Sequence, residues 1–244
     1  MSTVSDHLGS DGETHWHEER HAIVVNAAGV GLAVAAYGVS FGAISVTGGL
    51  SVLQTQFLSA LMFTGGSQFA LVGVLIAGGG LASAVATSVM LGFRNAFYAL
   101  SMAPVLRVHG LRRLVAAQLT IDESTAMAVG RSVEHDDGRA ARLAFWATGI
   151  SVFVFWNLAT LLGALGANAL GDPKIWGLDA AIPAGFIALV WPRLNDRRSW
   201  TIGLVAAVVA LALTPFLRPG IPVLLTAVVA VVAGVLAVRR KVES

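Results

Sequence analysis

Residues 22–93 include no Asp, Glu, Lys or Arg, and no other feature of the sequence limits the fold as strongly. A helix needs roughly 20 apolar residues to cross a bilayer, so this stretch is long enough for several crossings. Charged residues make up 12% of the chain, whereas soluble domains carry about 25%. We therefore expect an all-α, multi-pass membrane protein surrounded by a lipid bilayer.

Hydropathy and turn residues divide the chain into about seven predicted spans. The polar, acidic residues 1–21 precede them as a tail, residues 22–238 form the transport domain, and residues 239–244 form a basic tail. In the first span, Gly38 and Gly42 have the small-xxx-small spacing that lets another helix pack closely. The predicted spans are residues 22–44, 52–77, 81–106, 143–171, 178–191, 199–217 and 219–238.

The segment 107–141 differs from the spans because arginines accumulate in it and its apolar runs are too short to cross a bilayer. Thr120 and Glu123 have the spacing of a capping box, which predicts a helix that starts at about Ile121. The segment is either a pair of helices at the surface or a re-entrant element that dips toward the core. The sequence alone leaves both alternatives open.

Basic loop residues indicate the orientation, because they gather on the cytoplasmic side of membrane proteins. With seven spans, one side holds only Arg20, Lys174 and Arg218. This asymmetry predicts an outside N-terminus and a cytoplasmic C-terminus. The other side holds Arg107, Arg112, Arg113, Arg131, Arg139, Arg193, Arg197, Arg198, Arg239, Arg240 and Lys241.

Gly65 and Gly66 fall in the middle of the second predicted span. Each glycine weakens a helix by about 1 kcal/mol relative to alanine, so we expect a broken helix with its second half beginning near Ser67. The free N–H groups and positive end of that second half would face a carboxylate. The alternative is that the two glycines only let another helix approach.

Arg94 is the first charged residue after the uncharged stretch, and it lies near the middle of the third predicted span. An arginine at the centre of a membrane helix costs about 2.5–3.5 kcal/mol, so we expect it to have a role. It either binds or gates a substrate or forms a structural ion pair with Asp122 or Glu123. Tyr98 lies on the same helical face as Arg94.

Asp122 and Glu123 also have two interpretations. They are either the water-facing start of a helix or, if partly buried, a proton-coupling pair whose protonated form is favoured by desolvation. The chain has no cysteine, and its six histidines lie outside the predicted spans. We therefore expect no catalytic residue, no metal site, no cofactor and no enzymatic activity. The net charge of +2 gives no indication of nucleic-acid binding.

Three blocks carry a resemblance to a known family: residues 63–69 (Phe-Thr-Gly-Gly-Ser-Gln-Phe), residues 91–104, which include Arg94 and Asn95, and residues 120–123 (Thr-Ile-Asp-Glu). In their order and spacing these blocks resemble the AzlC family of branched-chain amino acid permeases. Asn95 stands where the family usually has His. The resemblance implies export of branched-chain or similar amino acids across the bacterial plasma membrane, with a small AzlD-type membrane protein as partner.

These observations predict a secondary transporter driven by an ion or proton gradient, because the chain has no nucleotide-binding motif. The alternative is a membrane subunit that does not transport but folds or regulates a small partner. Asp122 and Glu123 are the predicted coupling or gating residues. The predicted substrate-binding residues are Thr64, Gly65, Gly66, Ser67, Gln68, Arg94, Asn95 and Tyr98.

Overall fold

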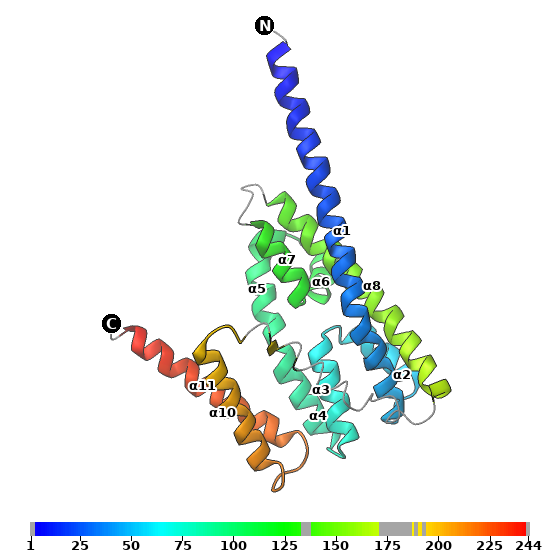
Figure 1. Ribbon diagram of the computed structural model, residues 1–244, viewed down its shortest axis with the longest axis vertical. Helices are drawn as coiled ribbons and strands as arrows, with labels where there is room; N and C mark the ends of the chain where they lie inside the picture. Colours follow the sequence, from blue (N-terminus) through cyan, green and yellow to red (C-terminus); the bar gives the residue numbers. More distant parts are fainter. Residues whose placement is uncertain (1–2, 133–137, 171–186, 188–189, 192–193, 243–244) are drawn as a thin grey trace.

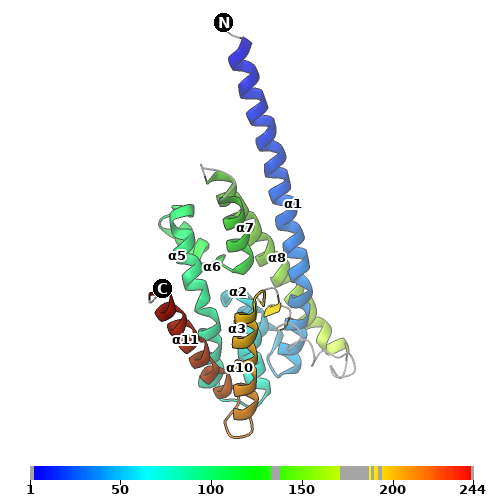
Figure 2. The ribbon, with the colours of Figure 1, turned by 60° about the vertical axis from the view of Figure 1, so that its left-hand side comes forward.

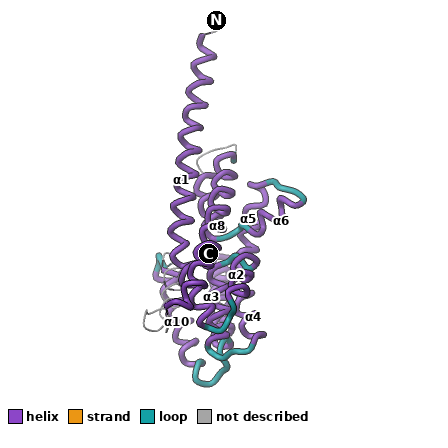
Figure 3. The backbone as a smooth tube through the Cα atoms, turned by 90° about the vertical axis from the view of Figure 1, so that its right-hand side faces the viewer, coloured by secondary structure: helices purple, strands orange, loops and turns teal. Residues whose placement is uncertain are grey.

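The structure is a computed structural model that describes residues 3–132, 138–170, 187, 190, 191 and 194–242. In these ranges the chain forms helices joined by turns, without a strand (Figure 3). The predicted fifth span, residues 178–191, lies mostly outside the described residues. The helices are α1 (Thr3–Thr47), α2 (Val52–Leu61), α3 (Gly65–Ile76), α4 (Leu81–Gly92), α5 (Arg94–Leu106), α6 (Leu111–Gln118), α7 (Asp122–Ser132), α8 (Arg139–Leu170), α10 (Arg197–Leu213) and α11 (Ile221–Val242).

Helices α1 and α8 run parallel and lie side by side along most of the molecule (Figures 1 and 2). At one end the guanidinium of Arg139 sits 4.0 Å from the ring centre of Trp16. Toward the other end, a Cβ on Gly42 would collide with the Thr160 carbonyl oxygen. This contact confirms the close packing predicted from the glycine spacing. Helix α1 also begins much earlier than the predicted first span, so the acidic N-terminal segment continues the helix from Thr3.

Helices α2 and α3 form a hairpin, here called the first hairpin, instead of the broken but continuous crossing that the sequence predicted. The Gln68 side-chain amide donates hydrogen bonds to the carbonyls of Leu58 (3.1 Å) and Ser59 (3.2 Å), so the two helices lie antiparallel. A Cβ on Gly48, just before α2, would collide with Ile76 at the end of α3. Both ends of the hairpin therefore lie near the end of α1. The predicted break is confirmed, but the chain reverses there.

Helices α4 and α5 together make the third predicted span, with an interruption at Phe93 that the sequence analysis did not predict. Gly92 lies at this interruption, and a Cβ there would sit 3.0 Å from the Ser67 hydroxyl. One turn earlier in α4, the Ser88 hydroxyl donates to the Ser67 carbonyl over 2.9 Å. The interruption in α4–α5 therefore lies against the start of α3.

Helices α6 and α7 form a second hairpin, which folds inward, so the re-entrant alternative for residues 107–141 describes it better than a surface pair. At its tip Ala116, Leu119 and Ile121 are buried. The Gln118 amide donates to the carbonyls of Ala60 (2.8 Å) and Leu61 (3.4 Å), at the end of α2. The tips of the two hairpins therefore meet inside the molecule, as Figure 1 illustrates.

The start of α7 lies within one residue of the predicted position, but its capping differs from the prediction. The Thr120 hydroxyl donates back to the Ala116 carbonyl (2.7 Å) and does not cap the helix. Instead, the Ser124 hydroxyl accepts a hydrogen bond from the Ile121 N–H over 3.1 Å. The local sequence therefore fixes the helix start through Ser124, three residues beyond Ile121.

The same plan, a hairpin followed by a long helix, occurs twice and in opposite directions. The first hairpin and α4–α5 start from the end of the molecule at Thr47, and the second hairpin and α8 start from the end at Arg139. Inverted repeats of this kind hold the substrate site of many transporters between their halves. Within the described residues, three helical segments are long and apolar enough to cross a membrane: Trp16–Thr47, Leu81–Leu106 and Arg139–Ala167.

Helices α10 and α11 form an antiparallel pair whose connecting turn lies beside the α3–α4 turn. The Ser83 hydroxyl donates to the Pro219 carbonyl over 2.9 Å. The turn therefore lies near Thr47, at the end of the molecule opposite Arg139. Large apolar side chains such as Leu53, Leu100 and Leu162 are exposed around the bundle, as expected for a surface in contact with lipid.

Candidate functional site

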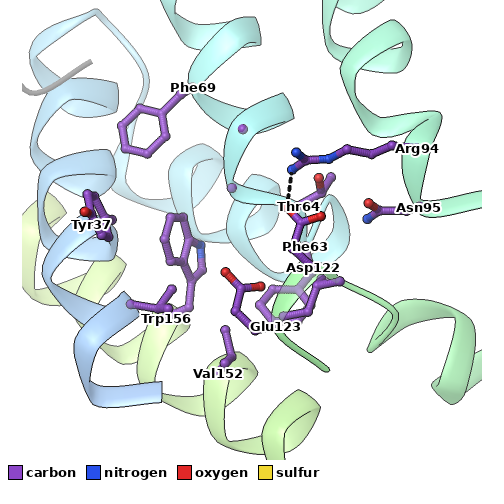
Figure 4. A pocket seen from close by; sticks show the side chains of 14 residues that line it. Tyr37, Phe63, Thr64, Phe69, Arg94, Asn95, Asp122, Glu123, Val152 and Trp156 are labelled. Carbon is purple, nitrogen blue, oxygen red and sulfur yellow. Dashed lines mark ion pairs between the residues drawn. The ribbon is translucent and has the colours of Figure 1, made fainter. Parts of the chain in front are cut away.

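A cavity lies where the tips of both hairpins, the interruption of α4–α5 and the middle of α8 meet. It offers about 80 Å³ to the centres of water-sized molecules, and one water needs roughly 10–15 Å³ on that measure. The cavity is therefore suited to a small solute. Its lining residues are Val34, Tyr37, Phe63, Thr64, Gly65, Gly66, Phe69, Arg94, Asn95, Ile121, Asp122, Glu123, Val152 and Trp156 (Figure 4).

The N-terminus of α3 opens onto this cavity. The N–H groups of Ser67 and Gln68 both bond to the Thr64 carbonyl, at 2.9 and 3.3 Å. The first N–H groups of a helix have no partner within the helix, which here applies to Gly65 and Gly66. These N–H groups and the positive end of the helix dipole favour an anion. The helix end that the sequence analysis predicted to face a carboxylate therefore lies at this cavity.

Arg94 and Asp122 form an ion pair at the edge of the cavity, with 2.9 Å between the guanidinium Nη2 and the carboxylate Oδ2 (Figure 4). About a third of the Arg94 side chain and a sixth of the Asp122 side chain are exposed. The Arg94 Nε is buried without a hydrogen-bond partner among the described residues. The guanidinium therefore keeps one donor for a ligand even while it is paired with Asp122.

The opposite part of the cavity has an apolar wall made by α1, α3 and α8. Phe41, behind this wall, packs against Phe69 with their ring centres 5.5 Å apart and against Trp156 at 6.0 Å. Phe69 and Trp156 are themselves 6.4 Å apart in an edge-to-face arrangement. The rings fix one another, so the wall is a rigid apolar surface. A solute with a charged end and a hydrocarbon end matches the two parts of the cavity.

Most of the residues predicted for the site meet here. Thr64, Gly65, Gly66, Arg94 and Asn95 line the cavity together with the predicted coupling residues, Asp122 and Glu123.

The other three predicted residues do not line the cavity. Ser67 is buried, with its hydroxyl 3.3 Å from that of Thr64. Gln68 is also fully buried and holds the first hairpin together. Tyr98 lies one turn farther along α5, outside the lining residues. In this structure Ser67 and Gln68 therefore have structural contacts in place of the predicted ligand contacts.

Sequence reasoning missed the contribution of α1 and α8, which supply Tyr37, Val152 and Trp156. The position of Trp156 in the sequence could have identified it as a candidate site residue. Tryptophans in membrane proteins favour the two interfaces, whereas Trp156 lies in the middle of a predicted span. A tryptophan at that depth needs a polar partner for its N–H group, or a ligand that supplies one.

All residues that line the cavity lie within the part of the chain that matches a known protein family. The family model described as AzlC protein matches residues 29–170, which include every residue that lines the cavity. An uncharacterized membrane protein of Helicobacter pylori is 26% identical over 181 residues, which cover 72% of this chain and 77% of that protein. Inner membrane protein YgaZ of Escherichia coli is 27% identical over 187 residues, covering 71% and 74%. No solved structure matches the chain.

Proposed function

The chain belongs to the AzlC family, and on that premise we propose that it is a secondary transporter that exports branched-chain or related amino acids. Its relatives are named as membrane proteins, and its long apolar helices agree with a place in the bacterial inner membrane.

One observation carries the proposal: a single small cavity combines an anion-favouring helix end, carboxyl groups and an apolar wall. An amino acid has a carboxylate, an ammonium group and a side chain. The carboxylate would face the N-terminus of α3 and the remaining donor of Arg94. The ammonium group would face the carboxyl groups of Asp122 and Glu123, which line the cavity. An aliphatic side chain would pack against Phe69 and Trp156.

The ion pair between Arg94 and Asp122 is the proposed gate. Arg94 belongs to the first repeat and Asp122 to the second, so the pair joins the two halves across the cavity. Opening the cavity to one side requires the halves to separate there, and breaking the pair permits this. Alternating access by movement of one repeat against the other is common in transporters with inverted repeats.

We also propose a revised orientation, with both termini in the cytoplasm. The first hairpin returns to the side of the membrane from which it starts. The Glu19 carboxylate, before the first predicted span, and the Arg131 guanidinium, after the third, therefore lie on one side, with 3.8 Å between Oε1 and Nη1. The end of α5, the start of α6 and the start of α8, which carry Arg107, Arg112 and Arg139, lie at this same end of the molecule (Figure 1). Basic residues mark the cytoplasmic side. The N-terminus therefore joins the side predicted for the arginine-rich segment.

The family resemblance supplies a small AzlD-type membrane protein as the proposed partner. Spans rich in glycine and alanine have faces suited to another helix. Copurification after co-expression of the two chains tests the partnership directly. Failure to copurify, together with full transport by the single chain, would show that the partner is dispensable.

Counterflow in liposomes tests the transport function. The purified chain, alone and with its partner, is reconstituted in vesicles loaded with unlabelled leucine, and uptake of labelled leucine is measured. Competition by a panel of the other amino acids then gives the substrate range. Transport by the single chain supports the proposal, and transport only with the partner makes the transporter a complex. No flux in either preparation for any amino acid would refute the amino-acid function and favour a subunit that regulates its partner.

A further inference from the structure

Trp156 carries a buried hydrogen-bond donor that no described residue satisfies. Its side chain is 4% exposed and lies in the middle of α8. The indole Nε1 has no hydrogen-bond partner within the described part of the chain. Buried polar groups are nearly always hydrogen-bonded, and a buried tryptophan N–H usually finds an acceptor. An unsatisfied donor at this depth therefore indicates a missing acceptor.

The indole is aimed into the cavity. Figure 4 shows its nitrogen-bearing edge directed toward the middle of the lining residues, where the Glu123 side chain also ends. The ring is held in this orientation by Phe41 and Phe69, which pack against it from α1 and α3. Rotation away from the cavity would disturb both contacts. The direction of the N–H group is thus fixed by packing in the absence of a ligand.

The N-terminus of α3 adjoins the same ring. A Cβ on Gly65 would lie 3.3 Å from Cη2 of Trp156, so the glycine lets the helix end approach the indole closely. The N–H groups of Gly65 and Gly66 and the indole N–H are therefore donors that α3 and α8 place at the same cavity. The buried Nε of Arg94 adds a fourth donor at the cavity.

We propose that Trp156 is a substrate-binding residue whose indole N–H donates to the carboxylate of the bound amino acid. The indole nitrogen can only donate, so its partner is an acceptor, and an ammonium group is excluded. A carboxylate has several acceptor positions and matches donors that come from α3 and α8 at once. The proposal deepens the proposed function and rests on it.

The experiment compares leucine binding to wild-type protein, Trp156→Phe and Trp146→Phe, by calorimetry in detergent. Phenylalanine keeps one aromatic ring in contact with Phe41 and Phe69 but removes the N–H group together with the five-membered ring of the indole, a loss of volume that the Trp146→Phe control shares. Trp146 is the matched control, because it lies on the same helix, packs against the core and does not line the cavity. Hydrogen bonds to charged groups correspond to a change of roughly tenfold to hundredfold in affinity. We expect a loss of leucine affinity of that size for Trp156→Phe and a loss of less than twofold for Trp146→Phe.

A second measurement uses unaltered protein, in case Trp156→Phe does not fold. The protein is labelled with ¹⁵N-tryptophan, and the indole resonances of its six tryptophans are assigned by single Trp→Phe changes at the other five positions. Leucine should shift the Trp156 resonance downfield, as a new hydrogen bond does. The amine 3-methylbutylamine, which is leucine without its carboxylate, should leave it in place.

The outcomes separate this assignment from the proposed function. Unchanged leucine affinity in folded Trp156→Phe, or a Trp156 resonance that does not move with leucine, would overturn the role of Trp156 alone. Wild-type protein that binds no amino acid at all would overturn the proposed function, and this assignment with it.

Discussion

The Arg94 guanidinium lies 2.9 Å from the Asp122 carboxylate, and each of the two residues is the first residue of its helix, α5 and α7. The sequence left two roles open for Arg94, a ligand contact or an ion pair with a nearby acid. In the structure it forms the ion pair with Asp122 and also lines the cavity. The two roles are therefore compatible, and the pair joins the two halves of the inverted repeat.

A double-mutant cycle on this pair tests whether the contact is energetically coupled. Arg94→Gln and Asp122→Asn should each lower the free energy of unfolding by about 1–3 kcal/mol, because each leaves the other group without its charged partner. The double variant should lose clearly less than the sum of the two. Thermal unfolding in detergent provides the measurement. Strictly additive losses would show that the two side chains do not stabilise each other.

The affinity of an Arg94 variant for leucine distinguishes a role of Arg94 in substrate binding from a purely structural role. Arg94→Lys keeps the positive charge but loses the planar fork of donors. If the free Nε donor holds the carboxylate, folded Arg94→Lys should bind leucine roughly tenfold more weakly. A folded lysine variant with wild-type affinity would leave Arg94 as a gate residue only.

Gln68 is predicted to stabilise the first hairpin without contacting the substrate. Gln68→Ala removes two hydrogen bonds to the carbonyls of Leu58 and Ser59 and leaves both near a buried gap. We expect a loss of about 1–3 kcal/mol in unfolding free energy, with unchanged leucine affinity in the folded protein. Gln54→Ala, at the exposed start of α2, is the control and should cost less. A selective loss of affinity in Gln68→Ala would restore the ligand role that the sequence predicted.

The membrane class, most helix positions and half of the residues that line the cavity were predictable because hydropathy and isolated polar groups determine them. Arg94 and the pair of glycines at 65 and 66 stand out in apolar sequence wherever the helices go. The reversal between α2 and α3 was not predictable in this way. A broken crossing and a hairpin have the same apolar length and the same break, and only long-range contacts such as Gly48 with Ile76 distinguish them.

The proposed orientation differs from the one expected from seven spans for the same reason. Counting residues 52–77 as a crossing places residue 47 and residue 77 on opposite sides, and every earlier loop changes side with it. The structure brings Glu19 to Arg131, which a seven-span chain would hold apart by the thickness of the membrane. The interruption at Phe93 was also hidden, because it depends on the contact of Gly92 with Ser67 from another helix. Local sequence around Phe93 contains no proline that would mark it.

Close packing of α1 on α8 gives a prediction with a control on the same helix. Gly42→Ala would place a methyl group against the backbone of Thr160 and Ala164, which cannot move aside as a side chain can. Overpacking of this kind typically costs about 1–3 kcal/mol. Gly29→Ala, in the same helix, meets nothing within 4 Å and should be neutral or slightly stabilising. Melting temperatures of the two variants in detergent should therefore differ clearly, and equal values would contradict the packing of the two helices.

Cysteine labelling tests the proposed orientation, and the chain suits it because it has no cysteine of its own. Thr47→Cys and Ala82→Cys introduce thiols at exposed positions before and after the first hairpin, and Arg112→Cys introduces one in the second. With a re-entrant first hairpin and a cytoplasmic N-terminus, an impermeant maleimide should label residues 47 and 82 in intact cells. Residue 112 should react only after the cells are permeabilised. In the seven-span arrangement residues 47 and 112 share the cytoplasmic side, so protection of both in intact cells, with residue 82 labelled, would refute the hairpin.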